Sequence, residues 1–317
     1  MVSNSLLAFA ATNYGFEEST LRFESDSTNQ IYFFKKDSKD YVLRFSSRPA
    51  EKIKETIAEM EWLDYLAQNG IGVGLPLKSQ SDELVISTQE EGKNYIISAF
   101  SVVTGKGGQW NDQVFYNWGK LMGDIHRLTK DFKPSNDHIV RSTFDGRFAL
   151  DDNVKSCPSV NVIVEDLIKE MLALPKDRDF YGLIHNDMHQ RNFLVDGNKI
   201  NVFDFDDSLY GWFALDIGIA LYHAVWWGRK DDDGNDLTDR IIQHFLKGYL
   251  SANHLSNFWL AKIPMFMKFR HICAFSWFFD PNDIGEHTKA QIAAIENGIL
   301  FTDCEIKASL FSNKVIQ

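Results

Sequence analysis

The chain has 317 residues, of which 44% are hydrophobic and 24% are charged. This composition is typical of a soluble globular protein of one or two domains, and it excludes disorder as the main state. The formal net charge of −11 excludes nucleic acid and an anionic membrane surface as main partners, because both require a basic face. The charge leaves open a small-molecule partner that is itself cationic.

No segment predicts export or membrane insertion. The apolar patch at residues 6–11 is short for a signal sequence and lacks a basic flank. The most apolar long stretch, residues 208–227, contains Asp216 and His223. A central Asp costs about 2.5–3.5 kcal/mol in a bilayer, so we expect a core helix there and a cytoplasmic protein. Three cysteines lie too far apart for a disulfide framework, and we expect them to be reduced: Cys157, Cys273 and Cys304.

The first hundred residues predict a small lobe of strands with one helix. Runs of β-branched and aromatic residues between turn-forming residues predict strands at 20–24, 30–34, 40–45, 83–88 and 94–100. An apolar stripe at helical spacing predicts a helix over residues 50–68, with Pro49 before its first turn and Gly70 after its end.

The rest of the chain predicts a larger, mainly helical lobe. Apolar stripes predict helices at 113–129, 160–173, 215–227, 236–251, 256–279 and 289–309. Pro264 is expected to interrupt the fifth of these helices. The fold class that follows is α+β, with a small lobe over residues 1–100 and a large lobe over residues 101–317.

One stretch of the large lobe concentrates polar residues of catalytic type. Two short apolar strands flank an Asp-Gly turn at 196–197, which predicts a β-hairpin. Asn192 precedes the first strand and Asp204 follows the second, so the hairpin brings them together at its open end. Asp187 lies in the loop that leads to the same end. Two carboxylates and a carboxamide suit a hard divalent cation such as Mg²⁺, with one group left over as a base.

These residues carry a resemblance to a known family. The segment His185-Asn186-Asp187-Met188-His189-Gln190-Arg191-Asn192, followed by Asp204-Phe205-Asp206, resembles the catalytic loop and metal-binding strand of the aminoglycoside phosphotransferase and choline kinase-like family. The resemblance covers residues 15–225. It implies a bilobal protein-kinase-like fold, ATP and Mg²⁺ as cofactors, and transfer of the γ-phosphate to a hydroxyl of a small molecule. An aminoglycoside, an amino alcohol or a hydroxy amino acid would be such an acceptor.

The resemblance assigns a role to each matching residue of the large lobe. Asp187 is implied as the catalytic base, and Asn192 and Asp204 as ligands of Mg²⁺. His185 and Asp216 are implied as structural supports of the catalytic loop.

The small lobe carries weaker matches. Arg44, where the family usually has Lys, is implied to contact the phosphates of ATP, and Glu59 to form its ion pair. Phe100 and Val102, in a hinge segment, are implied to hold adenine through their backbone groups. The loop between the first two strands contains no glycine. The side chains expected to hold phosphates there are Ser27, Thr28 or Asn29.

Aromatic residues gather after Asp204 and near the C-terminus: Tyr210, Trp212, Tyr222, Trp226, Trp227, Trp277, Phe278 and Phe279. At helical spacing such residues are usually core, but the resemblance implies an acceptor pocket in this region. Trp226 and Trp277, with nearby acidic residues, would suit an ammonium group through cation–π contact. Asp206 and Asp207 are interpreted as amine contacts, a second metal ligand or surface turn residues.

Other functions stay open. A protein Ser/Thr kinase of the same fold is one, although Asp206 replaces the glycine of the D-F-G motif. A nucleotide-binding pseudokinase is another, favoured only by Arg44 and the glycine-free loop. A transition-metal hydrolase that uses His185, Asp187 and His189 is a third, which leaves Asn192 and Asp204 unexplained.

Overall fold

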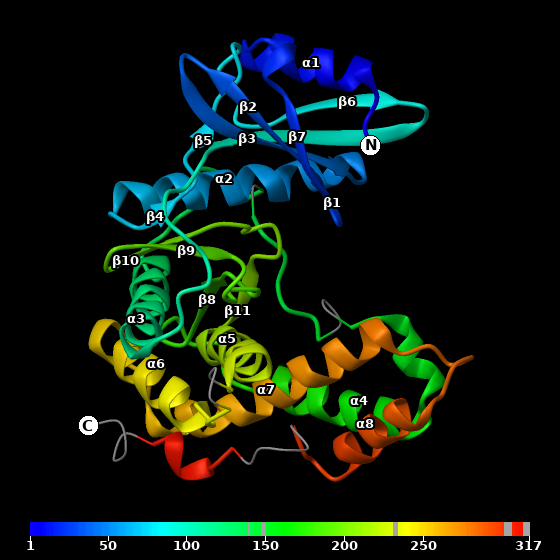
Figure 1. The fold of residues 1–317 in the computed structure, drawn as a ribbon, viewed down its shortest axis with the longest axis vertical. Coiled ribbons are helices and arrows are strands. Elements are labelled where there is room, and N and C mark those ends of the chain that lie inside the picture. The colour runs from blue at the N-terminus through cyan, green and yellow to red at the C-terminus, as the bar shows by residue number, and fades with distance from the viewer. Residues whose placement is uncertain (139, 147–149, 231–233, 301–305, 313–317) are drawn as a thin grey trace. The chain divides into compact units, whose positions relative to one another are not determined.

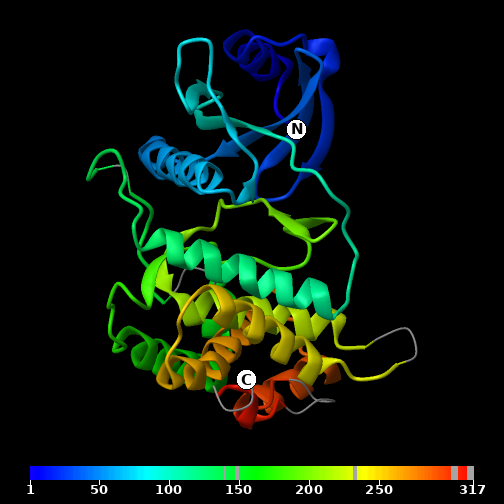
Figure 2. The same ribbon diagram turned by 90° about the vertical axis from the view of Figure 1, so that its left-hand side faces the viewer.

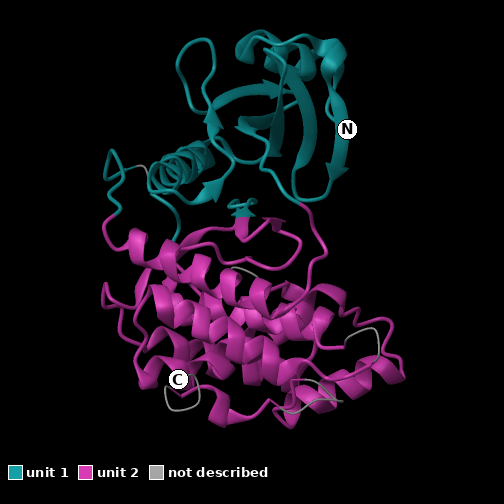
Figure 3. Ribbon diagram, turned by 60° about the vertical axis from the view of Figure 1, so that its left-hand side comes forward, with its two compact units in different colours: residues 1–105, 132–142, 201–206 teal, residues 106–131, 143–200, 207–317 magenta. Residues whose placement is uncertain are grey.

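The structure is a computed structural model that describes residues 1–138, 140–146, 150–230, 234–300 and 306–312. The chain forms two compact units, coloured separately in Figure 3. Unit 1 consists of Met1–Gly105, Phe132–Ser142 and Asn201–Asp206, and unit 2 consists of Lys106–Asp131, Thr143–Ile200 and Asp207–Gln317. The lobes at 1–100 and 101–317 stay a prediction.

The described residues contain no helix that is both long and apolar enough to cross a membrane. Cys157 and Cys273 are buried and free, and Cys304 lies outside the described residues.

Unit 1 is built on an antiparallel sheet with the strand order β1-β2-β3-β7-β5, and β6 also pairs with β7. Its elements are α1 (Asn4–Tyr14), β1 (Arg22–Asp26), β2 (Gln30–Lys36), β3 (Lys39–Ser47), α2 (Ile53–Gln68), β4 (Gly72–Val73), β5 (Pro76–Leu77), β6 (Ile86–Glu90) and β7 (Lys93–Ser101). The five predicted strands and the predicted helix are confirmed, with ends that differ by a few residues.

Helices α1 and α2 cover opposite faces of this sheet (Figures 1 and 2). Successive side chains of a strand point to opposite faces. In β3, Leu43 and Phe45 therefore join the core beneath α1, where they pack with Tyr14. Arg44, between them, points the other way and pairs with Glu59 of α2. The alternation along one strand thus separates an apolar core from a buried ionic site.

The sequence reasoning missed α1, because it considered only residues 6–11 and only as a signal segment. The helix is capped at both ends. The Ser3 side chain accepts a hydrogen bond from the amide of Leu6, and Gly15 ends the helix in the left-handed conformation at φ 68°. The buried face of α1 belongs to the core of unit 1.

Unit 2 is mainly helical. Its elements are α3 (Asp112–Thr129), α4 (Pro158–Leu172), β8 (Tyr181–Ile184), β9 (Phe193–Asp196), β11 (Leu209–Trp212), α5 (Phe213–Gly228), α6 (Thr238–Ala252), α7 (Asn257–Phe278) and α8 (Glu286–Glu296), together with the start of β10 (Lys199–Val202). Strands β9 and β10 form the predicted hairpin, and β8 pairs antiparallel with β11.

Helices α3 and α6 lie side by side (Figure 1) and approach each other at two glycines. A Cβ atom at Gly119 of α3 would lie 1.9 Å from the carbonyl oxygen of Phe245, and one at Gly248 of α6 would lie 1.9 Å from that of Tyr116. Neither position has room for a side chain, so both glycines are needed for this helix contact.

Two predictions about the large lobe were wrong. Helix α7 continues through Pro264, because its packing against α5 and α4 outweighs the single hydrogen bond that proline removes. The last predicted helix, 289–309, is too long: α8 ends at Glu296, and Gly298 follows in the left-handed conformation. Residues 301–305 of that prediction lie outside the described residues. The short strands β8 and β11 were not predicted.

Candidate active site

The catalytic loop that follows β8 is held through its backbone by a buried carboxylate. Asp216, in the first turn of α5, is fully buried and accepts hydrogen bonds from the amides of His185 at 3.0 Å and Asn186 at 2.8 Å. Asn186 has a φ of 65°, a conformation that is uncommon outside glycine and concentrated at functional sites. The carboxylate therefore fixes the two residues that precede Asp187.

His126 of α3 completes the hydrogen bonds of Asp216. Its Nε2 lies 3.0 Å from the carboxylate, and its Nδ1 lies 3.0 Å from the hydroxyl of Tyr249. Burial lowers the pKa of His126, against the opposing effect of Asp216, so the imidazole is neutral. A neutral ring with its proton on Nε2 donates to Asp216 and accepts from Tyr249, whose oxygen in turn accepts from Asn253 at 3.0 Å. Every member of this buried network is satisfied.

Asp187 is surrounded by hydrogen-bond donors. Its carboxylate accepts from Asn192 at 3.2 Å, lies 3.4 Å from Nε2 of His189, and forms an ion pair with Arg270 of α7. Burial alone would raise the pKa of Asp187, but the hydrogen bond from His189 and the charge of Arg270 hold it well below its ordinary value. Asp187 is therefore ionised at neutral pH.

Arg270 and His223 are residues of this site that the sequence reasoning did not assign. Nε of Arg270 donates to Nε2 of His223 at 2.9 Å, and its guanidinium lies 4.7 Å from the ring centroid of Trp277. Burial and the nearby Arg270 lower the pKa of His223 to about 2, so its ring is neutral and can accept this hydrogen bond. The sequence carried a signal for both: each is a polar residue inside a largely apolar helix.

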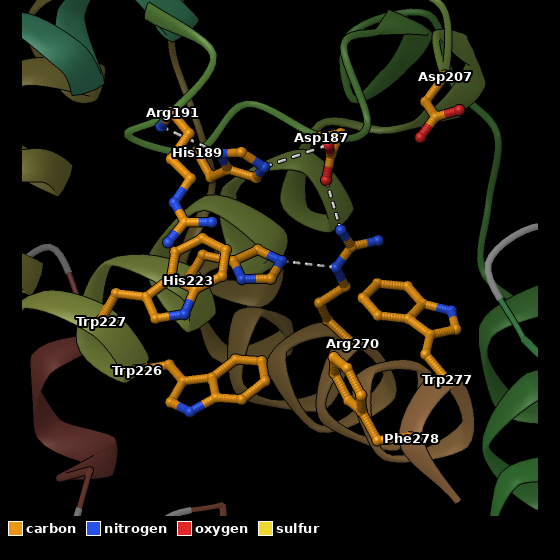
Figure 4. Close-up of a pocket in the computed structure, with 10 residues that line it drawn as sticks. All are labelled: Asp187, His189, Arg191, Asp207, His223, Trp226, Trp227, Arg270, Trp277 and Phe278. Atoms are coloured by element: carbon orange, nitrogen blue, oxygen red, sulfur yellow. Dashed lines mark hydrogen bonds and ion pairs between the residues drawn. The ribbon is translucent and has the colours of Figure 1, made fainter. Parts of the chain in front are cut away.

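These side chains open into a pocket of about 560 Å³ within unit 2 (Figure 4). Its lining residues are Asp187, His189, Arg191, Asp207, His223, Trp226, Trp227, Arg270, Trp277 and Phe278. The volume is in the range of small-molecule sites. Asp207, Trp226 and Trp277, which the sequence suggested for acceptor binding, all lie here with Asp187.

Asp206 has different partners, all in unit 1. Its carboxylate accepts from Asn29 at 2.9 Å, pairs with Arg48 and lies 3.6 Å from Arg44. Burial would raise the pKa of Asp206, but Arg44 and Arg48 hold it well below its ordinary value. Asp206 is thus a buried anion paired with arginines, and it is not among the residues that line the pocket of Figure 4.

Arg44 and Glu59 form a buried two-pronged ion pair, with Nη1 and Nη2 at 2.8 and 2.7 Å from the carboxylate oxygens. Burial alone would lower the pKa of Arg44, but Glu59 and Asp206 raise it above its ordinary value. The guanidinium also lies 5.1 Å from the ring centroid of Phe100. The planar guanidinium of Arg directs two parallel N–H groups at one carboxylate, which the ammonium group of Lys cannot do.

The other residues expected at the nucleotide have varied surroundings. Ser27 and Thr28 are exposed in the turn between β1 and β2. The Asn29 side chain donates to Asp206 and accepts from Ser46 at 2.7 Å. The amide of Val102 donates to the carbonyl of Asp40 at 3.4 Å. Adenine and phosphate contacts at these positions stay predictions.

The expected metal ligands offer oxygen atoms. Asn192 directs its amide nitrogen at the carboxylate and carbonyl of Asp187, and its own carbonyl oxygen forms no hydrogen bond with the described part of the chain. Asp204 has a φ of 64°. Carboxylate and carbonyl oxygens are ligands that Mg²⁺ prefers, and Mg²⁺ binding at these two residues stays a prediction.

The transition-metal alternative has less support. Over the described ranges, no group of three His, Cys, Asp or Glu side chains could hold a metal ion. His185 is fully buried, and its Nδ1 accepts from the amide of Asp187 at 3.3 Å.

Comparison with known proteins establishes the class. The profile of the phosphotransferase enzyme family (APH) matches residues 19–255, so the chain belongs to this family. The chain is 35% identical to the amicoumacin kinase of Bacillus subtilis, over 96% of this chain and 95% of the relative. The structure is similar to that of the amicoumacin kinase hAmiN in complex with AMP-PNP, Ca²⁺ and Ami, with a TM-score of 0.82, 27% identity, and coverage of 95% of this chain and 93% of the other.

A more distant likeness concerns the fold alone. A microcompartment-associated aminopropanol kinase superposes with a TM-score of 0.72 at 18% identity, over 93% of this chain and 95% of the other. The predicted protein-kinase-like α+β fold is confirmed, and so is the predicted class, a kinase that phosphorylates a hydroxyl group of a small molecule.

Proposed function

We propose that the protein uses ATP and Mg²⁺ to phosphorylate a hydroxyl group of a small molecule bound in the Asp187 pocket, and that it works in the cytoplasm. The observation that carries the proposal is Asp187 itself. Its carboxylate is ionised, lines a pocket of small-molecule size, and follows a loop whose backbone Asp216 holds. A hydroxyl beside this carboxylate would be oriented for attack and would have an acceptor for its proton.

The remaining roles follow the chemistry of phosphoryl transfer, in which positioning and charge neutralisation supply most of the rate enhancement. Asn192 and Asp204 hold Mg²⁺ in this proposal, and the ion supplies charge neutralisation at the phosphates. Arg44, kept in place by Glu59, contributes positive charge toward the nucleotide. The buried bidentate pair supports this role, because it keeps the guanidinium in one orientation.

Amicoumacin is the first acceptor to test. The support is the 35% identity with a kinase of that name over nearly the whole length of both chains. A homoserine kinase of Neisseria meningitidis is 23% identical over 72% of this chain, which makes hydroxy amino acids the second group to test.

The test combines binding and turnover. Wild-type protein should unfold at a higher temperature with Mg·ATP than with ATP alone, since a ligand that binds only the native state stabilises it. ADP release with amicoumacin should fall by about 10³-fold or more in Asp187→Asn, because the proton acceptor is lost. Asp166→Asn, a matched change of an exposed carboxylate on α4, should match the wild type. Turnover by Asp187→Asn at the wild-type rate would refute the proposal.

A further inference from the structure

We propose that the acceptor presents a carboxylate or amide carbonyl oxygen to Arg191 and Arg270, and that the pocket disfavours ammonium-bearing acceptors that lack such an oxygen. The inference rests on the proposed function and concerns the pocket of Figure 4. It differs from the hypothesis, drawn from Trp226, Trp277 and nearby acidic residues, that this pocket binds an ammonium group through cation–π contact.

Two of the three indole rings of the pocket already carry a cation. The guanidinium of Arg191 lies 5.0 Å from the ring centroid of Trp227, and that of Arg270 lies 4.7 Å from the ring centroid of Trp277. Figure 4 shows the Arg191 guanidinium beside the Trp227 ring and the Arg270 guanidinium beside that of Trp277. An ammonium group gains cation–π energy only at an uncovered aromatic face. At these two rings an incoming ligand meets a guanidinium.

The negative charge of Asp187 at this end of the pocket is already neutralised. The carboxylate of Asp187 is paired with Arg270, so it is a weak attractor for a second cation. His223 is neutral, because burial and Arg270 lower its pKa to about 2. Arg191 is exposed and forms no ion pair with the described residues. The uncompensated charge among these four side chains is therefore positive.

Among the described residues, the guanidinium of Arg270 has a free N–H donor in a fixed orientation, which suits an oxygen atom of the acceptor. Its Nε donates to His223 and its Nη2 to Asp187, while Nη1 forms no hydrogen bond within the described ranges. These contacts fix the plane of the guanidinium before any ligand arrives. A planar fork of N–H donors matches a carboxylate or a carbonyl oxygen, and donors already fixed in place lose little entropy on binding. Since Asp187 marks the position of the reacting hydroxyl, the oxygen group must lie close to that hydroxyl.

The experiment uses three compounds that differ in one group. L-Threonine, L-threoninamide and (R)-1-amino-2-propanol share the hydroxyl and the amine, and carry a carboxylate, a carboxamide or a hydrogen on the same carbon. Tryptophan fluorescence in the presence of Mg·ADP reports binding, since three tryptophans line the pocket. Competition between compounds for phosphate from ATP reports turnover.

We expect the wild type to bind threonine and threoninamide about 10- to 100-fold more tightly than aminopropanol, the effect of a charge-assisted hydrogen bond. Arg191→Gln and Arg270→Gln should reduce this ratio, and Arg270→Lys should retain part of it. Arg240→Gln, a change of an exposed arginine paired with Asp112, should leave the ratio unchanged. Arg191 is exposed, so its variant stays informative even if replacing the buried Arg270 prevents folding.

Several outcomes would overturn the inference. One is tighter binding of aminopropanol than of the two carbonyl compounds, and another is no fluorescence change with any of the three at high millimolar concentration. A third is a ratio that survives both Gln substitutions. A fourth is a loss of affinity for Mg·ATP with an unchanged ratio, which would assign the arginines to the phosphates. If the wild type bound no Mg·ATP at all, the proposed function itself would fail.

Discussion

Replacing Asp216 by alanine tests whether a buried carboxylate holds the catalytic loop. The side chain is fully buried and accepts three hydrogen bonds, at 3.0 Å from His185, 2.8 Å from Asn186 and 3.0 Å from His126. Two of the three donors are backbone amides of the loop. Alanine would leave all three donors without a partner in a site that water does not reach.

The size of the effect follows from these contacts. A hydrogen bond to a charged acceptor contributes about 1.5–3 kcal/mol to the free energy of unfolding. The sum over three such bonds overestimates the loss in the alanine variant, because the loop can partly relax. Each buried donor left without its partner costs about 1–3 kcal/mol, and we expect Asp216→Ala to lower the free energy of unfolding by about 4 kcal/mol. Asp216→Asn keeps the shape but turns an amide N–H toward a donor, so it should cost about half as much.

The assay is urea unfolding followed by circular dichroism, with Mg·ATP binding and turnover measured on the same samples. Asp166→Ala, on the exposed face of α4, is the matched control and should unfold close to the wild type. Where Asp216→Asn folds, kcat should fall more than the affinity for Mg·ATP, because the loop positions Asp187. A wild-type unfolding midpoint for Asp216→Ala would show that the three contacts do not hold the loop.

Three further predictions concern other parts of the chain. Gly119→Ala would place a Cβ 1.9 Å from a backbone oxygen of α6 and should cost at least about 1–3 kcal/mol in unfolding free energy, whereas Gly285→Ala, with open space around it, should be nearly neutral; equal midpoints would contradict this. The pKa of His223 falls to about 2 in the folded protein, so the stability it contributes is complete above pH 6.5 and is lost as the pH falls below that value, by up to about 1.4 kcal/mol per pH unit. His223→Gln should therefore flatten the pH dependence of unfolding between pH 6.5 and 4, and an unchanged slope would disprove the assignment. Arg44→Lys keeps the charge but loses the two-pronged ion pair, and should raise the KM for Mg·ATP several-fold with little change at the acceptor pocket; an unchanged KM would remove Arg44 from the nucleotide site.

Local patterns predicted most of the fold. Runs of β-branched and aromatic residues between turn signals predicted five strands of the small lobe correctly. Apolar stripes at helical spacing predicted most of the helices. The failures have physical causes. Pro264 lies inside α7 because tertiary packing overrides a local helix breaker, and strands as short as β4 and β5 carry too few residues for a periodic signal.

The site was predictable where its residues are close in sequence. Asp187 and Asn192 belong to one loop, and the structure brings them together. Arg270 comes from a helix 83 residues further along the chain, and only the tertiary fold brings it to Asp187. The pairing of Asp206 with Arg48 joins residues 158 positions apart and was equally hidden. The net charge of the whole chain follows from its composition. The net charge inside one pocket depends on ion pairs between residues that are far apart in sequence.

The two ends of helix α5 serve different purposes. One end anchors the catalytic loop, and the other end lines the acceptor pocket. Its first turn holds Asp216, and its last turns hold His223, Trp226 and Trp227. At 1.5 Å per residue, Asp216 and Trp226 lie about 15 Å apart along the helix axis, beyond the separation at which mutational effects usually interact. Substitutions at Trp226 and Trp227 should thus alter which acceptors enter while the anchor of the loop stays intact. Libraries confined to these two positions should explore specificity with little loss of folded protein.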